Sequence, residues 1–375
     1  MKARVLSLSL VLLTFAGGCG RAQGLVESTL RIPIKDAGAG SLEAVMVRPD
    51  EPGPHPLAVL THGAPREASD RPGMSPWQLL PQAREFARRG WTTVVVMRRG
   101  YGDSDGVYAE DARGCTSQPD YYSAGVESAK DLREAIAYLS KRPEVDPSRI
   151  LSVGLSAGGF ATVALTADPP PGLVAAISFA GGRGSRKPDE VCNPEDLIRA
   201  FRAFGEKSRT PMLWVYADND HFFGPQIAQS FYQAFTQGGG KASFVRAAAF
   251  HRDGHALFSL GGIPLWTPLV DDFLKGQNLT LRTSLFALPE PPDVPPPSAL
   301  SATGRDEFRK YLTMPPHKAF VVNAAGSYGY VYGRRSADDA QKGAREHCEE
   351  NNSSGGACVL VPAETSAAGK PAGSP

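Results

Sequence analysis

The sequence is organised around residues 149–159, which read Arg-Ile-Leu-Ser-Val-Gly-Leu-Ser-Ala-Gly-Gly. Its first part, 150–153, is apolar enough for a buried strand, and the small residues after Ser156 suit a helix. The Gly-x-Ser-x-Gly pattern at the junction is typical of a nucleophile elbow, a tight turn that lifts a serine hydroxyl above the edge of a sheet. Side chains at Gly154 and Gly158 would collide with backbone in such a turn. The segment therefore predicts a strand, a turn that presents Ser156, and a helix.

Apolar runs short enough for buried strands recur on both sides of this segment, at 57–61, 91–97, 173–179, 212–217 and 242–247. Segments of helical character lie between or after them, near 77–89, 124–140, 226–237 and 265–274. At the start, 25–35 and 42–48 alternate apolar and polar residues, as a half-buried antiparallel hairpin does. Strands that alternate with helices at this spacing predict an α/β domain over 25–285, with a doubly wound and mostly parallel sheet.

The stretch from Gly181 to Thr210 interrupts this alternation. It begins Gly-Gly-Arg-Gly-Ser-Arg and holds an amphipathic helix near 194–204. Because it follows the strand that comes after the elbow, we expect it to lie over the same sheet edge as the serine and to form a lid. Tyr121 and Tyr122 are expected to shape the substrate pocket together with this lid.

A serine hydroxyl becomes a good nucleophile only when a base takes its proton, and the base needs an acid to orient it. Asp218 and Asp220 both follow the strand 212–217. Asp220 is favoured, because Ala217 then takes the place of the glycine in the acid loop pattern Gly-x-x-Asp. After the last strand, His251 and His255 compete for the role of base. His255 is favoured because it follows Asp-Gly at a loop tip before the final helix.

Negative charge that develops on the substrate needs two backbone N–H donors. Ala157 follows the serine directly and would supply one of them. The other is expected from the loop after the strand 57–61, which reads His-Gly-Ala. There Ala64 is the expected donor, and Gly63 would let the backbone come close.

The first 22 residues resemble an export signal, with Lys2 and Arg4 before a short apolar run. Ordinary cleavage after Ala22 is slightly favoured over a lipoprotein signal that ends before Cys19. A membrane contact is therefore expected only if Cys19 carries lipid. The 40 basic and 39 acidic residues nearly cancel, so the charge gives no indication of a nucleic-acid partner.

Apart from Cys19, the chain has four cysteines, an even number that suits an exported protein. Four cysteines allow three pairings. The local pairing is favoured over the others and over free thiols, with Cys115 bonded to Cys192 and Cys348 to Cys358. No metal site is predicted, because the sequence has no Cys-x-x-Cys and no nearby pair of histidines.

A proline-rich linker at 286–298 separates the main domain from a small C-terminal domain at 299–363, and a disordered tail is expected at 364–375. The small domain should combine helices near 305–312 and 337–349 with short strands. It could serve as a binding or anchoring module or as a packing appendage, and the packing appendage is the preferred interpretation.

Taken together, these residues resemble the α/β-hydrolase superfamily, and within it the esterases and peptidases similar to dienelactone hydrolase and prolyl oligopeptidase. The shared motifs span 25–277 and are His62-Gly63, Arg99-Gly100-Tyr101-Gly102-x-Ser104-x-Gly106, Val145-Asp146-Pro147-x-Arg149-Ile150, Gly154-x-Ser156-x-Gly158-Gly159 and Asp253-Gly254-His255. The resemblance implies hydrolysis through an acyl-serine without metal or organic cofactor. Ser156 would be the nucleophile, His255 the base and Asp220 the orienting acid.

Two departures limit what the resemblance implies. Dienelactone hydrolases use a cysteine nucleophile, and no β-propeller precedes the domain as in the oligopeptidases. The expected function is an exported serine hydrolase that cleaves a carboxylic ester of a small molecule. A peptidase or amidase of the same fold, or a hydrolase-fold protein that binds without turnover, are the alternatives.

Overall fold

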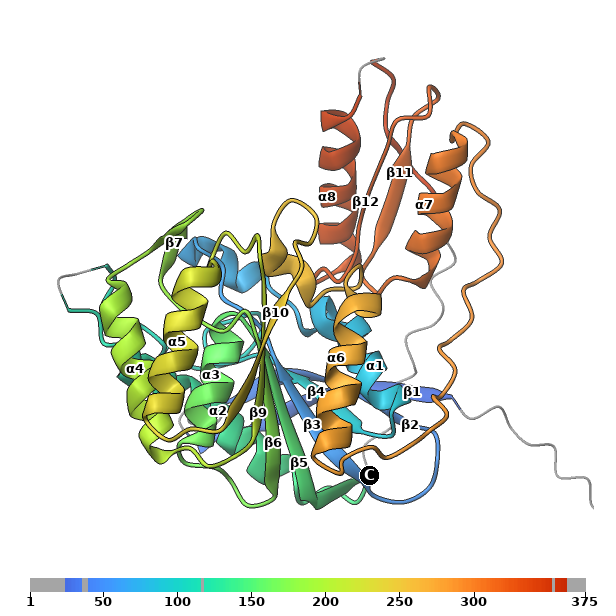
Figure 1. Ribbon diagram of the computed structural model, residues 1–375. Coiled ribbons are helices and arrows are strands. Elements are labelled where there is room, and N and C mark those ends of the chain that lie inside the picture. The colour runs from blue at the N-terminus through green and yellow to red at the C-terminus, as the bar shows by residue number, and fades with distance from the viewer. Residues whose placement is uncertain (1–23, 36–39, 116–117, 353–354, 363–375) are drawn as a thin grey trace, which may run out of the picture.

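The computed structural model describes residues 24–35, 40–115, 118–352 and 355–362 (Figure 1). Its centre is an eight-stranded sheet in the order β1-β2-β4-β3-β5-β6-β9-β10. The first two neighbour pairs, β1 with β2 and β2 with β4, are antiparallel, and every later pair is parallel. The strands are β1 (Leu25–Pro33), β2 (Ser41–Pro49), β3 (His55–Thr61), β4 (Thr92–Val96), β5 (Val145–Leu155), β6 (Leu173–Phe179), β9 (Met212–Ala217) and β10 (Ala242–Ala247). The predicted mostly parallel α/β sheet is confirmed.

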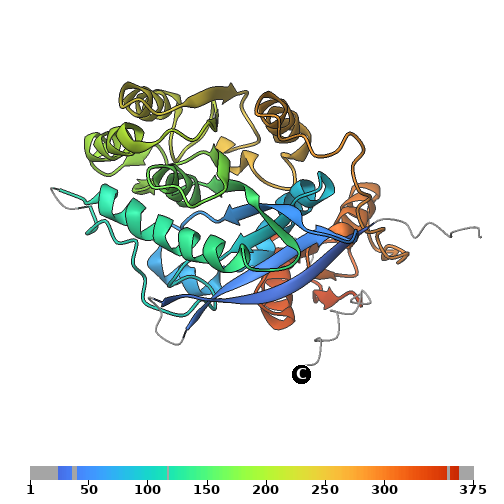
Figure 2. The ribbon, with the colours of Figure 1, turned by 90° about the horizontal axis from the view of Figure 1, so that it is seen from below.

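Helices cover both faces of this sheet (Figure 2). One face carries α2 (Tyr121–Leu139), α3 (Ala157–Thr166), α4 (Pro194–Lys207) and α5 (Pro225–Gln237), and the other carries α1 (Leu80–Arg88) and α6 (Ile263–Gly276). Alternate side chains of a strand point to opposite faces, so Val94 and Val96 of β4 join the first apolar cluster while Val95 joins the second. The central strands β3, β4, β6 and β9 are buried on both faces, which explains their nearly continuous apolar sequences, whereas the edge strands β1 and β10 are partly exposed.

The stretch expected to form a lid divides into two parts. Its first part contains the hairpin of β7 (Ser185–Lys187) and β8 (Glu190–Val191), which projects beside the sheet edge. The second part is α4, which belongs to the helical layer. Phe201 and Phe204 of α4 pack against Phe160 of α3 at ring-centroid distances of 5.1 and 5.6 Å. The apolar stripe of this helix therefore covers the core of the domain, and only the hairpin remains as a candidate wall of the site.

A C-terminal module, coloured orange to red in Figure 1, follows the proline-rich segment. It consists of α7 (Ala302–Thr313), β11 (Ala319–Val322), β12 (Tyr328–Val331), α8 (Ala337–Glu350) and β13 (Val359–Leu360). Its strands form a separate antiparallel sheet in the order β12-β11-β13. Phe308, Tyr311 and Phe320 lie at the centre of one of its two apolar clusters.

Some expectations fall outside the described residues, among them the signal at 1–22 with Cys19 and the tail at 364–375. Within the described ranges, no helix is both long and apolar enough to cross a membrane.

Candidate active site

The turn between β5 and α3 holds Ser156 in an unusual backbone conformation, with φ 56° and ψ −122°. Positive φ is rare for a residue with a side chain and stores strain that the surroundings must hold. Here the backbone is fixed on both sides. The N–H of Ser156 donates to the carbonyl of Phe179 at 2.9 Å, and its carbonyl accepts from the N–H groups of Phe160 and Gly182 at 3.0 and 3.1 Å. The structure therefore forms the strained strand-to-helix turn that the sequence predicts.

The glycines of this turn are required by close backbone contacts. A Cβ on Gly154 would lie 2.1 Å from the carbonyl oxygen of Gly158, and a Cβ on Gly158 would lie 2.5 Å from the carbonyl oxygen of His62. The loop after β3 also passes directly beside the serine, because a Cβ on Gly63 would lie 3.6 Å from Ser156 Oγ. Gly63 thus approaches the side chain of Ser156 closely, and the donor role of Ala64, the next residue, stays a prediction.

The predicted base and acid meet at the carboxyl ends of the neighbouring strands. His255 lies in a 3₁₀ turn, η4 (Gly254–Leu257), and its Nδ1 is 3.0 and 3.1 Å from the two carboxylate oxygens of Asp220. Asp220 is buried, and its Oδ1 also accepts from the backbone N–H groups of Phe222 and Phe223 at 2.7 and 2.8 Å. Because the carboxylate accepts from Nδ1–H, the Nε2 of His255 is left as the basic nitrogen.

The two competing residues lie elsewhere. Asp218 forms an ion pair with Arg246 on the surface, and His251 is exposed and stacks edge-on against Phe250. The structure therefore joins Asp220 to His255 and gives Asp218 and His251 no part in that pair.

A second, neutral histidine fixes the loop beside the serine. His62 is buried, and its Nε2 accepts from the backbone N–H of Arg98 at 3.1 Å, so Nδ1 carries the proton and donates to the carbonyl of Gly63 at 2.6 Å. Burial, together with the nearby Arg98 cation, holds the pKa of His62 well below its ordinary value, which keeps the ring neutral. Since the carbonyl of Gly63 and the N–H of Ala64 belong to one peptide, holding the carbonyl on one side directs the N–H to the other.

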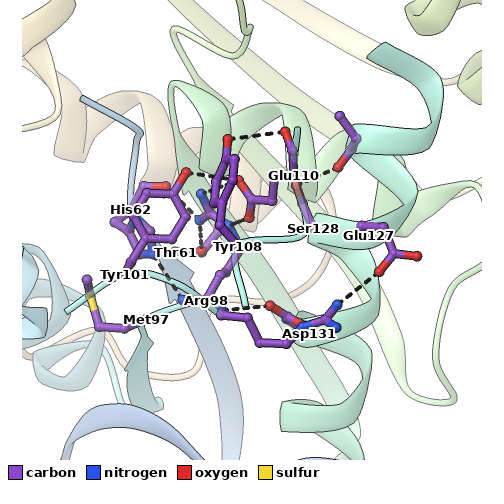
Figure 3. A network of polar contacts seen from close by, with 12 residues as sticks. Thr61, His62, Met97, Arg98, Tyr101, Tyr108, Glu110, Glu127, Ser128 and Asp131 are labelled. Atoms are coloured by element: carbon purple, nitrogen blue, oxygen red, sulfur yellow. Dashed lines mark hydrogen bonds and ion pairs between the residues drawn. The ribbon is translucent and has the colours of Figure 1, made fainter. Parts of the chain in front are cut away.

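A buried ion cluster lies beneath this loop (Figure 3). Glu110 is 1% exposed and forms ion pairs with both Arg98 and Arg183. Burial alone would raise the pKa of Glu110, but the two guanidinium groups outweigh it and hold that pKa far below its ordinary value. Arg98 Nη1 donates to Thr61 Oγ1 at 2.6 Å and to the carbonyl of His62 at 2.7 Å. Arg98 thus ties the end of β3 and the predicted oxyanion loop to the buried carboxylate of Glu110.

Sequence reasoning did not single out Arg98, Glu110 or Arg183. The only signal was the pair Arg98-Arg99 at the end of a buried strand, where charged residues are unusual. Nothing in the spacing indicates that Glu110 returns to this strand end, because the partners of a buried ion pair are set by the path of a loop.

Both tyrosines of the expected pocket pair have packing partners in the structure, and their pocket role stays a prediction. Tyr121 is 2% exposed, and its hydroxyl donates to the carbonyl of Cys192 at 2.5 Å. Tyr122 stacks on Phe204 of α4 at 4.9 Å, and its hydroxyl accepts from Lys207. Tyr121 therefore holds the chain that leads from the hairpin, and Tyr122, on α2, packs against α4.

Both cysteine pairs have the local pairing. The disulfide Cys115–Cys192 joins the loop before α2 to the end of the hairpin, and Cys348–Cys358 joins α8 to the approach to β13. In the described part of the chain, no group of three or more histidine, cysteine or acidic side chains is placed to hold a metal ion.

A mostly parallel sheet with antiparallel strands at one edge, and a strained serine turn between strand and helix at its carboxyl edge, are the features of the α/β-hydrolase fold. Residues 38–187 match the family model of X-Pro dipeptidyl-peptidase, the S15 family.

Similar proteins are distant. An acylamino-acid-releasing enzyme of Arabidopsis thaliana is 28% identical over 198 residues, which are 48% of this chain and only 23% of that protein. Among solved structures, a thermophilic esterase of Thermogutta terrifontis is 18% identical with a TM-score of 0.49, over 68% of this chain and 96% of that one. An esterase of Pyrococcus furiosus is 15% identical with a TM-score of 0.49, over 70% and 92%.

Proposed function

We propose that the protein is an exported serine hydrolase that cleaves a carboxylic ester of a small molecule through an acyl-serine intermediate. The observation that carries this proposal is the hydrogen bond between His255 Nδ1 and Asp220, formed at the same sheet edge as the strained Ser156. A serine in such a turn, with an oriented imidazole at the same edge, is the arrangement that nucleophilic catalysis needs.

In the proposed mechanism, Nε2 of His255 takes the proton from Ser156 Oγ as the oxygen attacks the carbonyl carbon of the substrate. The negative charge on the carbonyl oxygen is stabilised by the N–H groups of Ala64 and Ala157, each worth roughly 10²–10³ in kcat in comparable sites. The tetrahedral intermediate then collapses, and the imidazolium gives its proton to the departing alcohol. Water, deprotonated by the same imidazole, attacks the acyl-serine and releases the acid.

The surroundings support these steps electrostatically. Asp220 stabilises the imidazolium that forms in each half-reaction. The buried cluster of Arg98, Arg183 and Glu110 holds the loop that carries Ala64, because Arg98 donates to the carbonyl of His62. Asp220 and the buried cluster are held in place before the substrate binds, so little reorganisation of these groups is needed during the reaction.

Cleavage of a peptide bond is the second candidate. The family model that matches 38–187 is that of an X-Pro dipeptidyl-peptidase, and the plant relative is an acylamino-acid-releasing enzyme. The acyl-serine chemistry would be the same, with an amine in place of the alcohol.

Export and partners belong to the same proposal. Two disulfides support an oxidising compartment, where such bonds form and persist. The substrate is proposed to be a small ester rather than a nucleic acid, and the membrane would be involved only if Cys19 carries lipid.

The test compares wild-type protein with Ser156→Ala, using a fluorophosphonate probe and short-chain 4-nitrophenyl esters. We expect labelling and turnover in the wild type and neither in the variant, with the same thermal unfolding curve for both. X-Pro and N-acylaminoacyl nitroanilides, assayed in parallel, separate peptidase from esterase. Undiminished turnover by folded Ser156→Ala would overturn the role of this serine. Folded wild-type protein that is neither labelled nor active would favour the binding-protein alternative.

A further inference from the structure

Arg66 lies at the candidate site, two residues after Ala64. Its guanidinium carbon is 3.6 Å from the centroid of the Phe222 ring. Phe222 in turn stacks on the imidazole of His255, with centroids 3.9 Å apart and planes inclined by 16°. The cation is thus separated from the proposed base by a single aromatic ring.

The hydrogen bonds of Arg66 all go to neutral acceptors. Its Nη2 donates to Ser185 Oγ at 3.0 Å and to the carbonyl of His221 at 3.2 Å, and its Nε donates to the same hydroxyl at 3.3 Å. These bonds hold the side chain against the β7–β8 hairpin. Among the residues that the structure describes, no carboxylate lies within ion-pair distance of Arg66, and its Nη1 makes no protein hydrogen bond.

The acidic side chains nearby are already engaged. Asp220 accepts from His255, and Asp189 pairs with the Nδ1 of His221 at 2.9 Å. One oxygen of Asp253 accepts from the backbone N–H groups of His221 and His255. The carboxylates around the site therefore have partners, while the half-buried guanidinium of Arg66 lacks one. A partly desolvated guanidinium gains most from an ionised acceptor, and its planar fork fits a carboxylate.

We propose that Arg66 binds a free carboxylate of the substrate, so that the preferred substrates are esters that carry an acid group beside the scissile bond. This inference rests on the proposed function and names its substrate class. The carboxylate would approach Nη1 from the side opposite the hairpin, while the ester carbonyl lies between Ser156 and the N–H of Ala64.

The experiment uses two pairs of esters that differ only in this charge. One pair places it on the acyl side, as 4-nitrophenyl hemisuccinate against its methyl ester. The other places it on the leaving group, as 3-butyryloxybenzoate against its methyl ester. The wild type should prefer the charged member of at least one pair in kcat/KM, and that pair shows on which side the carboxylate binds.

Arg66→Gln removes the cation but keeps a planar group over Phe222. It should lower kcat/KM for the preferred charged ester by about 10- to 100-fold, mostly through KM, and change that of the neutral ester less than about threefold. Arg66→Lys should keep part of the preference. Lys187→Gln is the matched control, because it removes a cation of the same hairpin that pairs with Glu190 at 2.8 Å, and it should behave like the wild type.

Equal losses on charged and neutral esters would show that Arg66 only supports the stack on His255, and would overturn the proposal. A wild type without preference in either pair would do the same. In both cases hydrolysis of the neutral esters and labelling of Ser156 would persist, so the proposed hydrolase function would stand. Loss of that function would instead appear as wild-type protein that cleaves none of the four esters and takes up no probe.

Discussion

Asp218 and Asp220 both follow β9, yet their surroundings differ. Asp220 is buried and accepts from His255 and from two backbone N–H groups, which together fix the direction of its oxygens. Asp218 is 41% exposed and pairs with Arg246 on the surface. A carboxylate orients an imidazole only when it is itself held, so Asp220 alone is suited to that task.

We therefore expect Asp220→Asn to lower kcat by about 10³- to 10⁴-fold, because an amide at this position favours the wrong imidazole tautomer. The matched change Asp218→Asn should leave kcat within about twofold of the wild type. Hydrolysis of a 4-nitrophenyl ester, with thermal unfolding as the check on folding, measures both. Comparable losses in the two variants would contradict the assignment of the acid.

Single site residues could be predicted from the sequence where they directly follow predicted strands. Asp220 and His255 follow successive strands, and parallel strands bring their carboxyl ends to one edge, so their proximity could be expected. Arg66 and Glu110 lie in loops, where spacing carries no such information. The pocket role expected for Tyr121 is equally beyond the reach of the pattern, since an aromatic side chain near a site can line it or pack beneath it.

Among the elements, the turn between β5 and α3 has the least freedom. Three backbone hydrogen bonds hold Ser156 at positive φ, and Gly154 and Gly158 approach each other more closely than any Cβ would allow. A side chain at Gly154 would collide with the backbone of α3. This backbone is buried and cannot move aside.

Gly154→Ala should therefore lower the free energy of unfolding by roughly 3 kcal/mol or more, a loss typical of severe overpacking in a core. The control is Gly276→Ala at the end of α6, where a Cβ would meet nothing within 4 Å. Gly276→Ala should leave the free energy of unfolding unchanged or raise it by up to about 1 kcal/mol, since alanine favours the helix. Urea denaturation measures both. A Gly154→Ala protein within 1 kcal/mol of the wild type would show that the turn can relax.

Element type and order could be predicted because apolar runs and helical periodicity alternate along most of 25–277, with an interruption at 181–210. The helix α4, which the sequence places in a lid, shows the limit of such prediction. Its amphipathic pattern indicates that one face is covered, but it does not tell whether the cover is a substrate pocket or, as found, the ring of Phe160. The packing partner of a helix is a property of the whole domain.

On the scale of the whole molecule, the C-terminal module contacts segments that flank the candidate site. Arg335 pairs with Asp103 and donates to the carbonyl of Met74 at 3.2 Å, and His317 packs edge-on against Trp77. Met74 and Trp77 lie in the segment after the loop that carries Ala64, within and beside the 3₁₀ turns η2 (Ala68–Gly73) and η3 (Pro76–Leu79). The module thus supports a segment next to the predicted oxyanion loop.

The backbones also approach closely at Gly333, where a Cβ would lie 3.2 Å from the Cα of Gln78. Leu260, which follows the loop of His255, packs against the apolar cluster of the module. Contacts therefore reach the domain on both sides of the site. They agree with the packing appendage that is the preferred interpretation from the sequence.

Arg335→Glu tests this docking. The new carboxylate would face Asp103 and Glu43, the two acids that surround the guanidinium, so repulsion replaces attraction at the contact. Amide hydrogen exchange in 68–79 and 317–335 should become faster, while exchange in β5 and β6 stays unchanged. Arg345→Glu, the same reversal on the exposed side of α8, is the control and should leave all of these rates as they are. If exchange in 68–79 is as slow in Arg335→Glu as in the control, the ion pairs contribute nothing to docking, and the other contacts, among them those of Gly333, His317 and Leu260, hold the module in place.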